Sequence, residues 1–217
     1  MTEAIAAVHG FVALGGPVVA ILLAMSVLAV ALVIVKVWQF RKAGVGDHAA
    51  MVKALGHADR GATQQALQQA AAARNHLVPL AILALRVENR DEALRARLTG
   101  VAEESIARLQ SGFRLLESIA QVAPLLGLFG TVLGMIAAFQ ALQEAGTNVD
   151  PASLAGGIWV ALLTTAMGLG IAMPVTLVLT WLESRVAGET RLATQIIDVA
   201  LCRGLTQSTA EAGPSDG

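Results

Sequence analysis

The chain has 217 residues, of which 55% are hydrophobic and only 14% are charged, and its mean hydropathy is +0.65. About a quarter of the residues in a soluble domain are charged, so this composition predicts an integral membrane protein with a modest soluble part. The formal net charge of -1 argues against a nucleic-acid partner, and the single cysteine, Cys202, excludes an internal disulfide.

Charged residues are concentrated in parts of the chain and nearly absent elsewhere. Before Lys36 the only charged side chain is Glu3, and from residue 118 to residue 182 only Glu144 and Asp150 are charged. A membrane-spanning helix needs about 20 mostly apolar residues. The stretches that meet this requirement are 17–40, 118–142 and 154–182. The sequence therefore predicts an all-α integral membrane protein with three transmembrane helices.

The first span follows a short N-terminal segment, 1–16, that contains no lysine or arginine. Pro17 suits the first turn of a helix, because the N–H that proline lacks would have no partner there. Arg41 and Lys42 follow the span as a stop-transfer flank, and the apolar run is too long for a cleaved signal peptide. We therefore expect this segment to remain as a true transmembrane helix.

The distribution of lysine and arginine predicts the orientation of the spans, because cytoplasmic loops carry an excess of both. The loop 143–153 has neither residue, whereas the segment 41–117 is rich in both, and Arg185 and Arg191 follow the third span. We expect the N-terminus and the loop 143–153 to lie outside the cytoplasm. The segments 41–117 and 183–217 would then be cytoplasmic.

The cytoplasmic segment 41–117 has a helical composition and ends in an amphipathic stretch. Apolar residues recur there at steps of three to five: Leu94, Leu98, Val101, Ile106, Leu109, Phe113 and Leu116. This spacing is typical of one helical stripe that packs within a bundle. We predict one helix from Glu92 to Leu142, and a second long helix that continues past Leu182 into 183–217 before a polar, disordered tail.

Small residues surround a threonine in both the second and the third span. Positions three, four or seven apart share one face of a helix. The residues that share a face with Thr131 are Pro124, Gly127, Gly134 and Ala138. Those that share a face with Thr165 are Ala161, Gly168, Ala172 and Thr176. Each span therefore presents a narrow stripe of low relief with a hydroxyl near its middle.

The stripes have two interpretations, and the residues by themselves leave both open. Gly130 and Gly134 form a GxxxG pair, which lets membrane helices approach closely, and a threonine hydroxyl can bond a carbonyl of its own helix. Alternatively, the stripes line a shared path where hydroxyls contact water or a partner's polar group. Pro174 predicts a kink in the third span, and Pro124 predicts a bend where the second span enters the membrane.

The sequence contains none of the patterns that would indicate an enzyme. His9, His48, His57 and His76 are scattered, without the spacing of metal ligands. No phosphate-binding GxxxxGK[ST] motif and no nucleophile–base set occurs. The spans also lack the intramembrane carboxylate that normally marks a proton relay. We predict no catalytic residue, no metal site and no cofactor, and any proton-carrying carboxylate would come from another protein.

The run LLESIAQVAPLLGLFGTVLGMIAAF, followed by GGIWVALLTTAMGLGIAMPV, resembles the MotA/TolQ/ExbB proton-channel family. Three spans with the N-terminus outside resemble the ExbB/TolQ branch, because the MotA branch has four spans. The resemblance implies a pentameric ring of bacterial inner-membrane subunits around the single spans of an ExbD- or TolR-like partner, which carries the membrane aspartate. Protons would be the coupling ion, and a TonB- or TolA-like protein that spans the periplasm would receive the work.

The resemblance also implies which residues face the central pore. The threonine of GLFGTV and the second threonine of ALLTTA correspond to Thr131 and Thr165, and we expect Thr164 and Thr176 to contribute to the same proton pathway. A hydroxyl both donates and accepts, so it can bond an aspartate in either protonation state. The residues expected to pack the helices and give the pore a smooth wall are Pro124, Gly127, Gly130, Gly134, Ala161, Gly168 and Ala172.

One position departs from the family pattern. Some relatives carry a glutamate four residues before the first threonine of ALxTTA, where this chain has Val160. A role for a ring carboxylate in proton passage is therefore not transferred to this chain. The alternatives to an ExbB-like motor subunit are a TolQ-like subunit for envelope maintenance and a passive oligomeric scaffold without ion flux. The sequence does not exclude sodium as the coupling ion.

Overall fold

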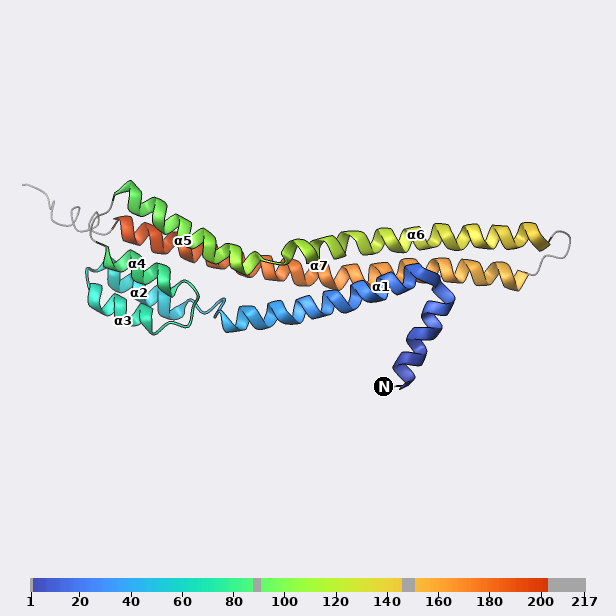
Figure 1. Ribbon diagram of the computed structural model, residues 1–217. Helices are drawn as coiled ribbons and strands as arrows, with labels where there is room; N and C mark the ends of the chain where they lie inside the picture. The colour runs from blue at the N-terminus through green and yellow to red at the C-terminus, as the bar shows by residue number, and fades with distance from the viewer. Residues whose placement is uncertain (1, 88–90, 146–150, 203–217) are drawn as a thin grey trace, which may run out of the picture. The chain divides into compact units, whose positions relative to one another are not determined.

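The computed structural model describes residues 2–87, 91–145 and 151–202. The helices are α1 (Thr2–Lys42), α2 (Ala49–Asp59), α3 (Thr63–Ala71), α4 (Val78–Arg86), α5 (Glu92–Gln110), α6 (Phe113–Ala145) and α7 (Pro151–Cys202) (Figure 1). These ranges contain no strand, so the predicted all-α fold is confirmed for them. The predicted disordered tail, and the centre of the predicted loop 143–153, lie outside the described residues.

The chain forms two compact units, which we describe separately. The span unit comprises Met1–Val35 and Gly112–Thr180. The bundle unit comprises Lys36–Ser111 and Trp181–Gly217. Helices α1 and α7 each contribute an apolar part to the span unit and a part with charged residues to the bundle unit.

Three helical stretches are long and apolar enough to cross a membrane, judged by length and composition: Gly16–Lys42, Glu92–Glu144 and Leu154–Cys202. Large apolar side chains are exposed along them, including Ile34, Leu125, Leu128, Phe129, Phe139, Leu162 and Leu177. A soluble monomer rarely exposes so much contiguous apolar surface. The structure therefore has three candidate membrane-spanning helices, as expected for a membrane protein.

Helix α1 changes direction at Gly16, and Figure 1 shows the preceding turns pointing away from the rest of the helix. Gly16 has φ 62° and ψ -159°, which is a conformation that only glycine adopts readily. Pro17 follows directly and begins the second, apolar part of the helix, where a missing N–H is tolerated. The first span is thus separated from the segment before it by a glycine–proline pair.

The predicted single helix from Glu92 to Leu142 is wrong, because the structure divides it in two. Helix α5 ends at Gln110 and helix α6 begins at Phe113. Gly112 lies between them with φ 80°, in the left-handed region that interrupts a right-handed helix. The apolar stripe continues across the break, so periodicity alone did not reveal it.

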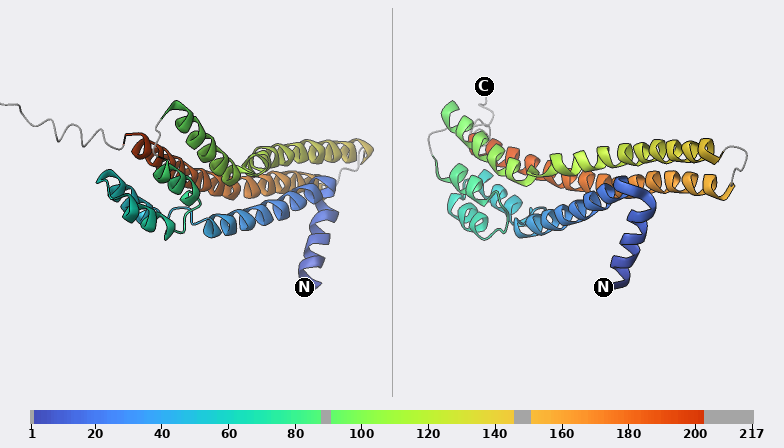
Figure 2. Two further views of the ribbon diagram at one scale, coloured as in Figure 1. Left: turned by 60° about the vertical axis from the view of Figure 1, so that its left-hand side comes forward. Right: turned by 45° about the vertical axis from the view of Figure 1, so that its right-hand side comes forward.

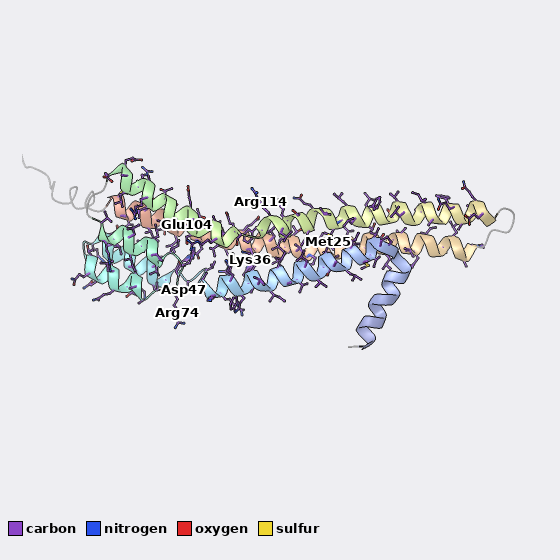
Figure 3. All side chains as sticks on the ribbon, in the orientation of Figure 1. Met25, Lys36, Asp47, Arg74, Glu104 and Arg114 are labelled. Carbon is purple, nitrogen blue, oxygen red and sulfur yellow. The ribbon has the colours of Figure 1, made fainter. Side chains whose placement is uncertain are left out.

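Side chains from the end of α1 bond the carbonyl groups that are left open where α5 ends. The Lys36 ammonium, labelled in Figure 3, donates to the carbonyl oxygen of Leu109 at 3.2 Å and to the hydroxyl of Ser111 at 3.1 Å. The Gln39 amide donates to the carbonyl oxygen of Arg108 at 3.3 Å. A cation at a helix C-terminus is also favoured by the helix dipole. These contacts supply hydrogen-bond donors to carbonyl groups that have no partner within the helix at the end of α5.

The bundle unit has a hydrophobic core built by α2, α3, α4, α5 and the end of α7, which gather together in both views of Figure 2. Its buried residues include Met51, Leu55, Ala66, Leu77, Leu80, Leu98, Leu192 and Ile196. Leu94 and Leu98 belong to the stripe that the sequence assigned to bundle packing, and both are buried in this core. The packing interpretation of that part of the stripe is confirmed.

Helix α7 runs from Pro151 to Cys202 as one element. Its extent confirms the predicted continuation beyond Leu182. Pro174 lies inside this helix, and the chain is helical on both sides of it. The last part of α7 reaches the bundle core through Leu192 and Ile196, so one helix supplies both a candidate span and a wall of the bundle.

Candidate functional site

Within the span unit, α6 and α7 lie side by side and meet through residues with little or no side chain (Figure 1). A Cβ atom added to Gly168 would lie 2.5 Å from the carbonyl oxygen of Ala123. One added to Gly127 would lie 2.8 Å from the carbonyl oxygen of Thr164. Since real Cβ atoms do not approach backbone oxygens so closely, glycine is required at both positions.

The same contact continues toward the α6–α7 loop. A Cβ atom on Gly130 would lie 2.6 Å from the Thr164 hydroxyl oxygen, and one on Gly134 would lie 3.0 Å from the Ala161 Cβ atom. The structure therefore places Gly127, Gly130 and Gly168 in helix packing within the chain, one of the two roles expected of them, while their role in a pore wall stays a prediction. Small residues drive close helix approach in membranes.

Two threonine hydroxyls converge on one carbonyl group at the centre of this contact. The Thr164 hydroxyl lies 3.2 Å from the carbonyl oxygen of Gly127 and 2.7 Å from that of Ala161, so it can donate its single proton to either. The Thr165 hydroxyl lies 3.2 Å from the same Gly127 oxygen. Thr164 is only 1% exposed, whereas Thr165 is half-buried.

The other two predicted hydroxyls bond their own helices. The half-buried Thr131 donates to the carbonyl oxygen of Leu128 at 2.6 Å. The exposed Thr176 donates to the carbonyl oxygen of Ala172 at 2.9 Å. In each case the hydroxyl proton is engaged while the oxygen keeps lone pairs that can accept a hydrogen bond.

The structure does not bring all predicted site residues into one cluster. Thr164, Thr165, Gly127, Gly130 and Gly168 meet at the α6–α7 contact, as the distances above establish. Of the remaining predicted residues, Ala172 is buried and Pro124 is half-buried. The contact itself carries no charged group, since all its members are glycine, alanine or threonine.

Sequence reasoning missed a polar cluster in the bundle unit. Glu189 on α7 is 0% exposed, and its Oε1 lies 2.8 Å from the Nε2 of His48 and accepts from the backbone N–H of Gly46 at 2.7 Å. Its Oε2 accepts from the Asn75 amide at 2.9 Å and lies 3.6 Å from the Nδ1 of His76. The two histidines show no metal-ligand spacing and are 28 residues apart in sequence, but they share one carboxylate.

His76 lacks the hydrogen bond to Glu189 that His48 makes. Both its ring nitrogens are buried and neither has a hydrogen-bond partner. Burial lowers the pKa of His76, the Glu189 carboxylate opposes this shift, and His48 adds to it. Among the residues that the structure describes, no group of three histidine, cysteine or acidic side chains is arranged to hold a metal ion.

The fold and the α6–α7 contact define an α-helical membrane protein with three candidate spans and a neutral, hydroxyl-bearing helix contact. The chain belongs to the MotA/TolQ/ExbB proton channel family, whose family model matches residues 51–195. That range includes the α6–α7 contact and the cluster around Glu189, and it confirms the resemblance noted in the sequence.

Relatives in other organisms carry the name ExbB. The chain is 34% identical over 133 residues to an ExbB homolog of Methanothermobacter thermautotrophicus, a match that covers 60% of this chain and 46% of the relative. It is 44% identical over 85 residues to the biopolymer transport protein exbB1 of Vibrio cholerae, covering 39% of this chain and 37% of the relative. It is 40% identical over 90 residues to the biopolymer transport protein ExbB of Xanthomonas campestris, a match that covers 41% of this chain and 33% of the relative. The chain thus matches less than half the length of these relatives.

Proposed function

We propose that this chain is an ExbB-like subunit of an inner-membrane complex driven by the proton gradient. Copies of the chain, five in our proposal, would surround the spans of an ExbD-type partner that supplies the membrane aspartate, and would energise a TonB-type protein across the periplasm. Membership of the family and similarity to proteins named for biopolymer transport support this proposal. The N-terminus would be periplasmic and the C-terminus cytoplasmic.

The single observation that carries the proposal is the chemistry of the α6–α7 contact. Residues 16–35, 118–143 and 154–182 contain no charged side chain, so hydroxyls are the polar side-chain groups best placed to meet a partner's carboxyl in the spans. A hydroxyl serves this purpose without the cost of burying a fixed charge. Thr131 and Thr165 are half-buried and so retain some accessible surface, whereas Thr164 is too deeply buried to be reached without rearrangement.

The hydrogen bonds of these threonines favour one protonation state of the partner. The hydroxyl protons of Thr131 and Thr165 are donated to backbone carbonyls. Their oxygens can then accept from a protonated carboxyl group, whereas a carboxylate would require the hydroxyl to leave its carbonyl. These two hydroxyls therefore stabilise the neutral partner acid more than the anion. This preference suits a step in which a proton is carried past the contact on the partner.

The proposal is tested by co-expression of this chain with the ExbD-like protein of its own genome and native mass spectrometry of the complex. We expect five copies of the chain with one or two partner chains. Proton flux into liposomes would then be measured for the complex and for a Thr131→Val and Thr165→Val double variant, which keeps side-chain volume and removes both hydroxyls. We expect the double variant to lose about tenfold or more of the flux, because it removes two hydrogen-bond acceptors worth about 1 kcal/mol each.

Two outcomes would contradict the motor. A stable monomer, or a one-to-one complex, leaves no ring for the threonines to line. A ring whose flux is unaffected by the double valine variant removes the hydroxyls from the pathway. Thr190→Val is a matched control, because Thr190 also donates to its own helix but lies in the bundle unit.

A second function, a passive oligomeric scaffold without ion flux, is favoured by one specific observation. Val160 stands where some relatives have a glutamate, and the spans carry no carboxylate of their own. The same liposome assay separates the two functions. A scaffold forms the ring and conducts no protons. The double variant at Thr131 and Thr165 then leaves its assembly and its partner binding unchanged.

A further inference from the structure

The cluster around Glu189 joins three segments of the bundle unit that are distant in sequence. Gly46 and His48 lie in the connector from α1 to α2, Asn75 and His76 lie in the connector from α3 to α4, and Glu189 lies on α7. The backbone of the two connectors is also joined directly, since the N–H of His76 donates to the carbonyl oxygen of Ala43 at 3.0 Å. A single buried carboxylate therefore holds both connectors to α7.

Asn75 is the central link of this arrangement. Its amide nitrogen donates to Glu189 at 2.9 Å and lies 3.3 Å from the carbonyl oxygen of Gly44. Its amide oxygen accepts from the backbone N–H of Leu77 at 2.8 Å, at the start of α4. Loss of the bond to Glu189 would leave one of the two N–H groups of this buried amide without its acceptor, which is costly. The attachment of the connectors to α7 therefore depends on the hydrogen bond from Asn75 to the Oε2 atom of Glu189.

We propose that this cluster is a proton-operated latch, in which a proton taken up by His76 releases both connectors from α7. The Nδ1 of His76 lies 3.6 Å from Oε2, just outside hydrogen-bond distance, and on the same oxygen that Asn75 occupies. An imidazolium at His76 needs an acceptor, and Oε2 is the acceptor nearest to it among the contacts described. Oε2 could accept from both Asn75 and His76, but the other ring N–H of the imidazolium, at Nε2, would be buried without an acceptor while the latch is closed.

One carboxylate can compensate only one imidazolium. The Oε1 atom already bonds His48, which donates to it either as the neutral Nε2–H tautomer or as the cation. A charge on His76 must also be buried, because both its ring nitrogens are inaccessible. Desolvation of a buried cation is unfavourable, and it lowers the pKa of His76. The latch therefore stays closed at neutral pH and opens when the pH falls.

Other charged groups near the latch do not reverse the direction of its pH dependence. On α7, Arg185 lies beside Gly46, where an added Cβ atom would be 2.8 Å from its guanidinium nitrogen. On α5, Glu104 and Arg108 line a cavity of about 130 Å³ together with His76, and they form an ion pair with each other. On the connectors themselves, Asp47 and Arg74 are exposed to solvent (Figure 3).

The sign of the pH dependence follows from proton linkage. Between the lowered pKa of His76 in the folded chain and its usual value of about 6.5 when unfolded, the opened state binds more protons than the closed state. The closed latch is therefore fully stable above that window and loses stability as the pH falls through it. This inference is independent of the proposed motor function, because it concerns the bundle unit alone and needs no partner.

The test is hydrogen exchange of the full-length chain in detergent or nanodiscs, followed by mass spectrometry and corrected for intrinsic exchange rates. It compares about pH 7.5 with about pH 5.5, on either side of the usual histidine pKa. We expect the protection of residues 43–48 and 74–78 to fall by up to about tenfold at the lower pH, while the interior of α2 stays unchanged. In His76→Gln, protection should be independent of pH.

A matched control is His57→Gln, which removes a histidine of α2 that lies outside the cluster. It should reproduce the pH response of the unmodified chain. A response that is absent from the unmodified chain, or that persists in His76→Gln, would overturn the proposal. If His76→Gln fails to fold, an NMR titration of labelled histidines in the unmodified chain decides instead: His76 must titrate below the ordinary range, together with the Gly46 amide that bonds Glu189.

Discussion

At the scale of single residues, the α6–α7 contact depends on the absence of side chains more than on the presence of any group. Gly168 has a backbone oxygen 2.5 Å from the position of an added Cβ atom, whereas Gly170, two residues later, has nothing within 4 Å. Both glycines lie on the same helix and within the same candidate span. They therefore form a natural pair for separating packing from helix propensity.

We expect Gly168→Ala to destabilise the chain by about 1–3 kcal/mol, because the new methyl group meets the backbone of α6. Gly170→Ala should instead be neutral or stabilise by up to about 1 kcal/mol, because alanine is the better helix former. Thermal unfolding of the purified full-length chain, followed by circular dichroism in one detergent, would compare the two variants. Equal effects at both positions would mean that the close approach of α6 and α7 does not limit stability.

At the scale of helices, the break between α5 and α6 is set by one glycine and by contacts from a distant helix. Gly112 has a left-handed φ of 80°, and Lys36 and Gln39 bond the last carbonyl groups of α5. The apolar pattern from Glu92 onward predicted the existence of a helix but not its end. Patterns in sequence report which face is buried, whereas a helix end often depends on partners that arrive from elsewhere in the chain.

We expect Gly112→Ala to cost about 1–2 kcal/mol, the strain of a left-handed conformation in an L-residue. Gly100→Ala is the control, because Gly100 lies inside α5 and an added Cβ atom meets nothing within 4 Å there. That variant should be neutral or slightly stabilising. Hydrogen exchange at residues 106–111 would report the first effect locally. Unchanged exchange and unchanged stability in Gly112→Ala would show that the break is not held by this glycine.

The dependence on contacts from distant parts of the chain also explains which residues of the candidate sites could be predicted from the sequence and which could not. Thr131 and Thr165 are predicted because small residues recur around them at helical spacing, and that spacing is a local property. His48, His76 and Glu189 could not be linked in this way, because the connectors and α7 meet only after the bundle has folded. Nothing in the sequence around Glu189 indicates that its side chain is buried, although its exposed fraction is 0%.

At the scale of the whole molecule, the chain is organised as two units, and the bundle unit contains its own junction between connectors and α7. Gly44 is the point of closest approach in that junction. Its φ is 66°, and a Cβ atom added to it would lie 1.6 Å from the carbonyl oxygen of Arg74. No rearrangement of a flexible side chain can relieve this overlap, since the neighbour is backbone.

We therefore expect Gly44→Ala to open the bundle unit while the span unit keeps its protection. The cost combines left-handed strain of about 1–3 kcal/mol with displacement of the α3–α4 connector, which also carries Asn75 and His76. Hydrogen exchange should rise in residues 43–87 and 182–200 and stay unchanged in residues 119–140. Gly56→Ala, in α2, has only the end of one arginine side chain at 4.0 Å and is the control that should behave like the unmodified chain. Equal loss of protection in both units would instead mean that they unfold as one cooperative body, held together by the continuous α1 and α7.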